Sequence, residues 1–184
     1  AIALGNVSEP EQLMLMGLTD ALTGLPNRRC FMERMLQEMS RASRYGQSTA
    51  CVYVDLDHFK SINDTHGHDV GDRCLQIFAD ILKEACRDTD IACRPGGEEF
   101  SLILSGAGTD AGMAVASRIQ AMLAQETRRQ GPVFTASLGI AARPIHGERS
   151  EEVLRSADVA LYDAKDRGRN RCVLAEVPMS LEVV

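Results

Sequence analysis

The chain has 184 residues, of which 45% are hydrophobic and 25% charged, and its formal net charge is −6. This length and apolar content suit one domain with a sizeable core. The acidic balance argues against a general binder of nucleic acids or membrane surfaces. No run of about 20 apolar residues is present, and the first residues lack the basic start and apolar run of a signal peptide, so we expect neither a membrane span nor a leader.

The six cysteines are scattered along the chain, and no two of them form a CxxC pair. Most of them lie in apolar contexts. Zinc sites and disulfide frameworks have characteristic cysteine spacings, which are absent here. We therefore expect buried free thiols and a reducing, cytoplasmic location.

The N-terminal part of the chain predicts little regular structure before residue 11. The segment over residues 11–29 is expected to form a short helix followed by a turn at Gly24-Leu25-Pro26. Apolar residues at helical spacing then predict a longer helix, and these residues are Phe31, Met35, Met39 and Ala42.

From Ser48 onward, strand and helix patterns alternate. The expected elements are a buried strand over 48–56, a helix over 70–86, a hairpin over 91–104, a helix around 115–123, a strand over 132–142, a helix around 153–164 and a final strand over 171–175. With the hairpin counted as two strands, the first six elements match a ferredoxin-like split βαβ unit. Right-handed crossovers then place the first strand beside the third and antiparallel to it. The hairpin tip therefore lies at the sheet edge where the first strand ends.

The tip of this hairpin carries two glycines followed by two glutamates. Gly96 and Gly97 allow a tight turn and a close approach of another group to the backbone. Glu98 and Glu99 are like charges side by side, and two carboxylates ~4 Å apart repel by roughly 4 kcal/mol at an effective dielectric constant of ~20. Either the glutamates point apart in a solvated turn, or a positive group binds there.

The end of the first strand adds two more carboxylates. Asp55 and Asp57 lie two residues apart and so on one face of the strand. The predicted topology brings Asp55 close to Glu98 and Glu99. Oxygen ligands of this kind suit a hard divalent cation, and magnesium with a nucleoside triphosphate is the usual case. The alternative is a solvated strand end.

Two further segments are rich in groups that bind phosphates or polar rings. In "HFKSINDTHGHDVGD", Lys60 offers a point charge for phosphate, the turn into the next helix offers free N–H groups, and Asn63 and Asp72 could read a base edge. A turn and helix cap is the alternative for Asn63-Asp64. In "AKDRGRNR", the cations could instead stabilise a helix dipole, and they are Lys165, Arg167, Arg169 and Arg171.

Four motifs together, "DALTGLPNRR", "VDLDHFKSINDTHGHDVGD", "RPGGEEF" and "ALYDAKDRGRNR", resemble a GGDEF domain, the catalytic domain of diguanylate cyclases. The resemblance covers Leu18 to Val173, with the signature present as GGEEF. It implies an α+β sandwich of the nucleotide-cyclase palm type, with a central, mostly antiparallel five-stranded sheet flanked by helices. It also implies a domain over 18–176, a linker or signalling-helix remnant over 1–17, a tail over 177–184 and an upstream sensory domain.

The same resemblance implies roles for individual residues. The metal ligands fall on Asp55, Glu98 and the backbone carbonyl of Leu56, for two Mg²⁺ ions per site with Mn²⁺ as a substitute. The catalytic set is Asp55, Glu98, Glu99 and Lys165. Asn63 and Asp72 read guanine. The remaining substrate contacts fall on His58, Phe59, Lys60, His68, Gly96, Gly97, Lys165 and Arg169. Pro95 departs from the family pattern, and because proline lacks a backbone donor it can shift the hairpin without touching a ligand.

The implied reaction condenses two GTP into cyclic di-GMP and pyrophosphate by two-metal phosphoryl transfer across a homodimer. "RDTD", from Arg87 to Asp90, resembles the family's product-inhibition motif, and Arg118 matches a further arginine of that site. The alternative for Arg87 and Asp90 is a surface ion pair worth under about 1 kcal/mol. A non-catalytic module that senses GTP or cyclic di-GMP is the alternative function. A cyclase that uses adenine in one half is a third possibility, against which Asp72 argues.

Overall fold

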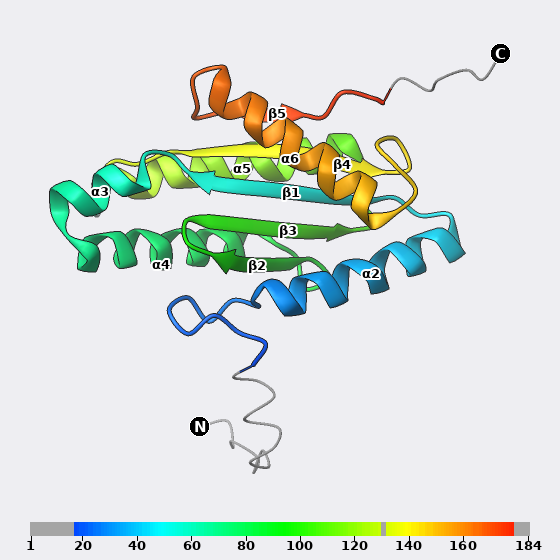
Figure 1. Ribbon diagram of the computed structural model, residues 1–184, viewed down its shortest axis with the longest axis horizontal. Coiled ribbons are helices and arrows are strands. Elements are labelled where there is room, and N and C mark those ends of the chain that lie inside the picture. The colour runs from blue at the N-terminus through cyan, green and yellow to red at the C-terminus, as the bar shows by residue number, and fades with distance from the viewer. Residues whose placement is uncertain (1–16, 130–131, 179–184) are drawn as a thin grey trace, which may run out of the picture.

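The computed structural model describes residues 17–129 and 132–178. They form one five-stranded sheet covered by helices on both faces (Figure 1). The strands are β1 (Thr49–Leu56), β2 (Ile91–Gly96), β3 (Glu99–Ser105), β4 (Ala136–Arg143) and β5 (Cys172–Leu174). The helices are α2 (Arg28–Tyr45), α3 (Phe59–His66), α4 (His68–Ala85), α5 (Thr109–Thr127) and α6 (Ser150–Asp166).

The strand order is β2-β3-β1-β4-β5. β1 runs antiparallel to both β3 and β4, and only β5 joins the sheet in parallel, beside β4. The predicted α+β class, the split βαβ order and the mostly antiparallel five-stranded sheet are therefore confirmed. The register places Asp55 directly opposite Glu99, so the end of β1 lies beside the hairpin tip.

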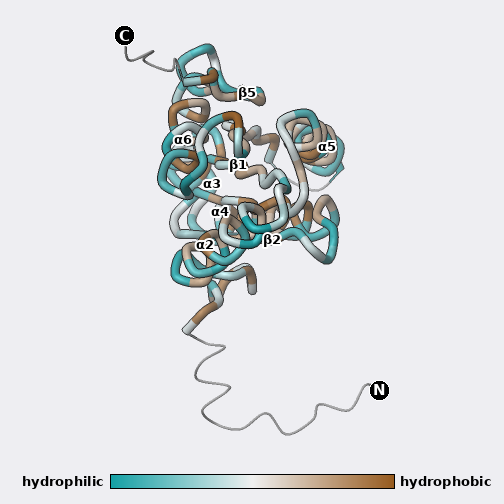
Figure 2. The backbone as a smooth tube through the Cα atoms, turned by 90° about the vertical axis from the view of Figure 1, so that its right-hand side faces the viewer, coloured by the Kyte–Doolittle hydropathy of each residue, from teal (hydrophilic) through white to brown (hydrophobic). Residues whose placement is uncertain are grey.

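Alternation along β1 separates two hydrophobic layers. Val52 and Val54 pack with α4 and α5 on one face of the sheet, whereas Cys51 and Tyr53 pack with α2 and α6 on the other. Figure 2, seen along the sheet, shows α2 and α6 on one side and α5 on the other. Asp55 continues the series of Cys51 and Tyr53, so its side chain belongs to the face covered by α2 and α6.

The predicted helices α2 and α6 are confirmed, and each buries the apolar stripe read from the sequence. In α2 the buried residues are Phe31, Met35, Met39 and Ala42. The side chain of Asn27 caps its start by accepting from the N–H groups of Arg29 and Cys30, and Gly46 ends it in the left-handed conformation. In α6 the predicted stripe is buried throughout, and it comprises Val153, Ala157, Ala160, Leu161 and Ala164.

Gly139 allows α6 to lie unusually close to β4. A Cβ atom built at this position would overlap the backbone of Ala157 and Leu161 in α6. Only glycine permits that approach of two backbones. The position of α6 matters because its C-terminal end carries Lys165 to the end of β1.

The predicted helix before Gly24 is wrong within the described residues. Residues 11–16 of that prediction, like almost all of the predicted linker over 1–17, lie outside them. Residues 17–27 form turns, with one isolated β-bridge between Thr19 and Pro26. Asp20 stabilises the turn because its carboxylate accepts from both the N–H and the hydroxyl of Thr23, a local arrangement that competes with a helix.

Two element boundaries also differ from the prediction. The stretch after β1, expected as a turn, contains the separate short helix α3, which Gly67 ends with a positive φ of 87°. The strand expected from residue 132 begins only at Ala136. Among the described residues, no helix combines the length and the apolar character needed to cross a bilayer. The six cysteines are free thiols, and Cys51, Cys74 and Cys93 are buried.

Candidate active site

The hairpin tip is a two-residue turn made by Gly97 and Glu98, since Gly96 pairs with Glu99. This is one residue later than the turn at Gly96-Gly97 that the sequence predicted. Gly97 needs the left-handed region, with φ of 53°, which glycine adopts at little cost. The N–H of Leu56 donates to the carbonyl oxygen of Glu98 at 3.2 Å. That bond fastens the tip to the end of β1.

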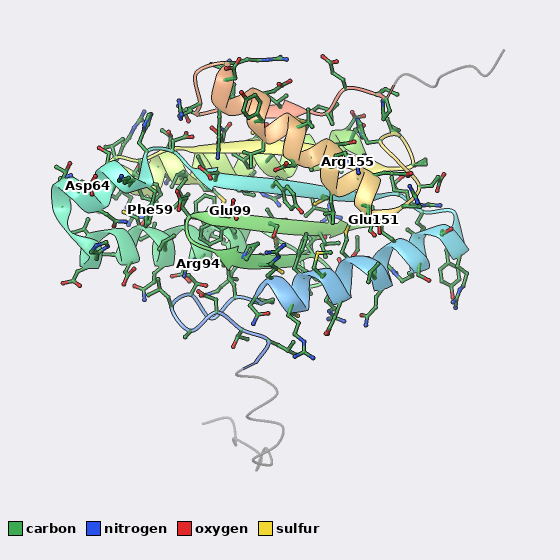
Figure 3. The ribbon with its side chains drawn as sticks, viewed as in Figure 1. Phe59, Asp64, Arg94, Glu99, Glu151 and Arg155 are labelled. Carbon is green, nitrogen blue, oxygen red and sulfur yellow. The ribbon has the colours of Figure 1, made fainter. Side chains whose placement is uncertain are left out.

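Arg94 supports the turn from below (Figure 3). Its guanidinium donates to the carbonyl oxygen of Gly97 from Nε at 3.0 Å and from Nη2 at 2.7 Å. The same group forms an ion pair with Asp20 at 2.9 Å, and Arg94 is only 9% exposed. Burial by itself would raise the pKa of Asp20, but the hydrogen bonds from Thr23 and Arg94 outweigh it and lower the pKa below 3.8.

Neither Arg94 nor Asp20 had a predicted role, although both lie in motifs that resemble the family. A cation inside the otherwise apolar strand "IACRPG" was the signal that could have found Arg94. A buried charge is stable only with partners. The strand therefore implied an acidic partner, and the fold supplies it from the N-terminal turn.

Pro95 is accommodated by an irregularity in the hairpin. The register of β2 against β3 shifts between Cys93 and Gly96, so Pro95 lies within a bulge. β2 is also an edge strand, where a missing backbone donor interrupts no second ladder. The expected shift of hairpin geometry is thus local.

Carboxylates and one lysine meet where β1 ends. Lys165 Nζ lies 2.7 Å from Asp55 Oδ2, and the side chain of Asp55 is 14% exposed. Burial raises the pKa of Asp55, and the nearby carboxylates of Glu98 and Asp57 raise it further, while Lys165 partly offsets them. Glu98 is half-buried and Glu99 exposed. Negative charge is therefore concentrated at this edge and favours a bound cation.

The donors at this edge match a divalent-cation site whose coordination is completed by water and substrate oxygens rather than by protein side chains alone. Among the described residues, no group of three or more His, Cys, Asp or Glu side chains is placed to hold an ion. The predicted set has two carboxylates, Asp55 and Glu98, and the carbonyl of Leu56. Mg²⁺ is usually held in this way, by one or two carboxylates, with water and substrate phosphates completing the octahedron. The donor chemistry thus suits a cation that arrives with a nucleotide.

Asn63 and Asp72 come from the neighbouring helices α3 and α4. The side chain of Asn63 packs against Gly71, where a Cβ atom would overlap Asn63 Oδ1. That oxygen is buried and has no hydrogen-bond partner within the described part of the chain. An unpaired buried acceptor costs free energy, and a rotation of the Asn63 side chain toward a donor on a bound ligand would recover that cost. Asp72, the next residue after Gly71, is exposed and open to the same ligand.

The predicted phosphate contacts lie at the starts of α3 and α4 and in the loop after α6. His58 adopts a left-handed conformation, with φ of 56°, at the start of α3, and no side chain caps this helix. Phe59 is buried, whereas Lys60 and His68 are exposed. Arg169 is exposed in the loop after α6, where its N–H donates to the carbonyl oxygen of Ala164 at 2.9 Å.

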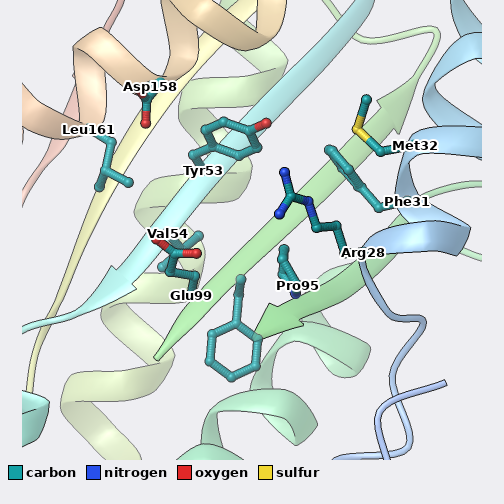
Figure 4. A pocket seen from close by; sticks show the side chains of 10 residues that line it. Arg28, Phe31, Met32, Tyr53, Val54, Pro95, Glu99, Asp158 and Leu161 are labelled. Atoms are coloured by element: carbon teal, nitrogen blue, oxygen red, sulfur yellow. The ribbon is translucent and has the colours of Figure 1, made fainter. Parts of the chain in front are cut away.

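A cavity of about 260 Å³ opens next to Glu99, between α2, α6 and the hairpin (Figure 4). Its polar lining comes from Arg28, Tyr53, Glu99 and Asp158, and the rest is apolar. Burial raises the pKa of the Tyr53 hydroxyl further above neutral pH. Of the residues predicted for the site, Glu99 is the one that lines this cavity.

The "RDTD" segment does not form the simple surface ion pair that was its alternative. The carboxylate of Asp90 accepts from the backbone N–H of Arg87 at 3.0 Å, and the N–H of Asp90 donates to the carbonyl oxygen of Arg87 at 2.9 Å. This closed turn uses the backbone of Arg87 and not its guanidinium, and the residue is exposed. Arg118 of α5 donates to the carbonyl oxygen of Ala85, near the end of α4. The structure therefore brings all three residues into one neighbourhood.

Comparison with known proteins gives consistent matches over nearly the same residues. The family described as "Diguanylate cyclase, GGDEF domain" matches residues 17–171. Diguanylate cyclase DgcP of Pseudomonas aeruginosa is 41% identical over 161 residues, which are 86% of this chain and 24% of that protein. Cyclic di-GMP phosphodiesterase NbdA of the same species is 36% identical over 160 residues, 86% of this chain and 20% of that protein. The chain thus spans about a quarter or less of the length of these two relatives.

Solved structures support the same fold. The coiled coil and GGDEF domain of DgcB from Caulobacter crescentus, solved in complex with c-di-GMP, superposes with a TM-score of 0.83 at 30% identity. The match covers 90% of each chain.

Proposed function

Because this chain belongs to the GGDEF family of diguanylate cyclase domains, we propose that it condenses two GTP molecules into cyclic di-GMP and two pyrophosphates. The observation that carries the proposal is the junction at the end of β1. There the Lys165–Asp55 ion pair and the bond from Leu56 N–H to Glu98 join three of the four family motifs. Resemblance in sequence alone does not establish that these segments lie together in the folded chain.

Each domain holds one GTP. Its guanine meets Asn63 and Asp72, whose amide and carboxylate match the base edge, and the free Oδ1 of Asn63 supplies an acceptor. Its phosphates lie near Lys165, Arg169, Lys60, His68 and the backbone of His58 and Phe59. Gly96 and Gly97 carry no side chain that would keep the triphosphate from the hairpin.

The reaction consists of two equivalent steps. In each, the 3′-hydroxyl oxygen of one GTP bonds to the α-phosphorus of the other, the bond to the β-phosphate oxygen breaks, and the hydroxyl proton is released. Asp55, Glu98 and the carbonyl of Leu56 would hold divalent cations, Mg²⁺ or Mn²⁺, which activate the hydroxyl and neutralise the leaving pyrophosphate. Glu99 adds negative charge beside them, and Lys165 offsets charge on the phosphates. The protein's share is positioning and charge stabilisation.

A single domain cannot complete the product, because each of its two phosphodiester links joins nucleotides held by different domains. Two copies must therefore face each other, at least transiently. We further propose that product bound at Arg87, Asp90 and Arg118 restrains activity. An arginine fork can pair with a phosphate or guanine edge and stack on a ring.

The direct test is to incubate the chain with GTP and Mg²⁺ and to identify the nucleotide products by chromatography and mass. Cyclic di-GMP is expected, and Asp55→Asn or Glu98→Gln should reduce its formation more than about ten-fold because magnesium loses a charged ligand. Asp69→Asn, an exposed carboxylate on α4, is the charge-matched control. Activity of Asp55→Asn close to that of the unmodified chain at saturating Mg²⁺ would contradict the assignment.

The alternative function, a non-catalytic sensor of GTP or cyclic di-GMP, is kept because one relative is named a phosphodiesterase. In such a protein a domain like this one would regulate another activity. Binding of GTP without any turnover in the same assay would favour this alternative.

A further inference from the structure

Asp57 is a buried carboxylate that the proposed reaction does not use. Its residue is only 3% exposed. It accepts hydrogen bonds from Thr135 Oγ1 at 2.6 Å, from Ser137 Oγ at 2.7 Å and from the backbone N–H of Asn170 at 3.0 Å. A carboxylate has about four acceptor positions, so three of them are filled from inside the fold. This arrangement differs from the solvated strand end that was the alternative for this residue.

Of the three donors, Asn170 is the most distant from Asp57 in sequence, and it lies in the loop that follows α6. Arg169 and Asn170 both adopt the left-handed conformation, with φ of 63° and 48°. Two successive non-glycine residues rarely do so, because Cβ crowds the carbonyl oxygen. The loop therefore has a shape that its own residues do not favour, and the bond from Asn170 to Asp57 spans 113 residues of sequence to hold it.

The loop carries Arg169 and follows the last turn of α6, which carries Lys165. The N–H of Arg169 donates to the carbonyl oxygen of Ala164, and the N–H of Gly168 donates to the carbonyl oxygen of Lys165. These hydrogen bonds attach the loop to the end of α6. Fixing Asn170 thus fixes the path of the backbone at Arg169. Loss of this constraint would let the guanidinium sample many orientations.

We infer that Asp57 is a positioning residue: it fixes the 168–171 loop so that Arg169 faces the triphosphate, and it is not a ligand of the cation. The inference rests on the proposed GTP site. It predicts a change in nucleotide affinity opposite to the one expected from charge alone, because Asp57→Asn removes a negative charge from a site for a polyanion. Electrostatics alone would tighten nucleotide binding, whereas loss of positioning weakens it.

The test measures binding of a non-hydrolysable GTP analogue to the unmodified chain, Asp57→Asn, Arg169→Ala and the double variant, each with Mg²⁺ and with EDTA. We expect Asp57→Asn to weaken binding about ten-fold in both conditions, as loss of a charge-assisted hydrogen bond can. The double variant should bind about as weakly as Arg169→Ala alone, since the two residues act through one contact. Asp64→Asn, an exposed carboxylate on α3, is the charge-matched control.

Unchanged or tighter binding by Asp57→Asn in EDTA, with loss only when Mg²⁺ is present, would overturn the inference and make Asp57 a metal ligand. Additive losses in the double variant would also overturn it. If Asp57→Asn does not fold, Thr135→Val serves instead, because it removes one donor and keeps the charge, and it should give a smaller loss of the same pattern.

A second readout is independent of the nucleotide. The amide of Asn170 should exchange its hydrogen faster in Asp57→Asn than in the unmodified chain, while amides in the middle of α6 keep their rate. Equal exchange at Asn170 in both proteins would overturn the inference even if GTP binding were confirmed. Failure of the unmodified chain to bind the analogue would instead contradict the proposed function, and the exchange result would still decide whether Asp57 holds the loop.

Discussion

At the residue scale, Asp72 is expected to decide which base enters the site. A carboxylate can accept from both the N1–H and the amino group of guanine, and adenine lacks this pattern of donors. A site built around such hydrogen bonds can reject an analogue by roughly 10⁴. We predict that Asp72→Ser lets ATP compete with GTP, measured as consumption of each nucleotide in a mixture. Asp69→Ser on the same helix is the control, and equal use of ATP by the unmodified chain would show that Asp72 does not read the base.

The contribution of Asp20 to the free energy of unfolding should depend on pH. Its pKa in the folded state lies below the value of 3.8 for the free side chain. A carboxylate whose pKa is lower in the folded than in the unfolded chain stabilises the fold above pH ~4. This contribution is lost as the pH falls through the pKa of the folded state. We predict that the difference in unfolding free energy between the unmodified chain and Asp20→Asn, measured by urea titration, is largest near pH 7 and shrinks toward pH 3. A difference that stays constant over this range would contradict the prediction.

Single residues were predicted from the sequence when they belonged to a motif with a direct chemical reason. Asp55, Glu98 and Lys165 were named, and the structure places their side chains near one another, while their roles stay predictions. Arg94 and Asp57 were missed or misjudged because their partners lie far away in sequence. The contact of Arg94 with Asp20 spans 74 residues and that of Asp57 with Ser137 spans 80, which no local pattern reveals.

At the element scale, the contact between α6 and β4 controls where Lys165 lies. A methyl group at Gly139 would overlap the α6 backbone, which cannot yield as a side chain can. We predict that Gly139→Ala destabilises the fold by about 2 kcal/mol, as expected for overpacking, and weakens GTP binding through the displaced Lys165. Unfolding by denaturant measures the first effect.

Gly108→Ala is the matched control for this prediction. Nothing outside its immediate neighbours lies nearer than 3.9 Å to a Cβ atom at that position, and its φ of −91° suits alanine. Because glycine is preferred over alanine at an N-cap, Gly108→Ala should still cost up to about 1 kcal/mol, which is less than the cost at Gly139. Equal stability of the two variants would show that the helix can move away from the sheet freely.

Element predictions succeeded where an element was long enough to show its period. The stripes of α2 and α6 repeat over about three turns, and both helices formed as expected. α3 has eight residues and buries only Phe59 and Ile62, too few for a period to be visible. The strand predicted over 132–142 began too early. Phe134 is apolar and buried, but it lies before the paired residues of β4.

At the scale of the whole molecule, the order of elements was sufficient to predict the sheet. Given the split βαβ order, the handedness rule left one arrangement for β1, β2 and β3, and the structure has it. The functional assembly could not be predicted in the same way, because it depends on a second copy. The proposed pairing of two copies rests on the two-fold symmetry of the proposed product rather than on any pattern in one chain.

Feedback by the product is the prediction that belongs to this scale. We expect cyclic di-GMP to bind at Arg87, Asp90 and Arg118 and to hold two domains apart from the productive arrangement. Arg87→Ala should remain active while losing inhibition, because its guanidinium lies outside the junction at the end of β1. Calorimetric titration of cyclic di-GMP, with the active site blocked by a GTP analogue, measures the affinity. Arg128→Ala, an exposed arginine at the end of α5, is the control, and equal affinity in Arg87→Ala and the unmodified chain would contradict the prediction.

The central claim is that two copies of this chain together make cyclic di-GMP from GTP. The most direct measurement is the stoichiometry and initial rate of product formation over a range of protein concentrations in Mg²⁺. The account predicts two GTP consumed and two pyrophosphates released per cyclic di-GMP, with a rate per domain that rises with protein concentration until dimers predominate. GTP that binds but yields no cyclic di-GMP at any concentration would contradict the claim.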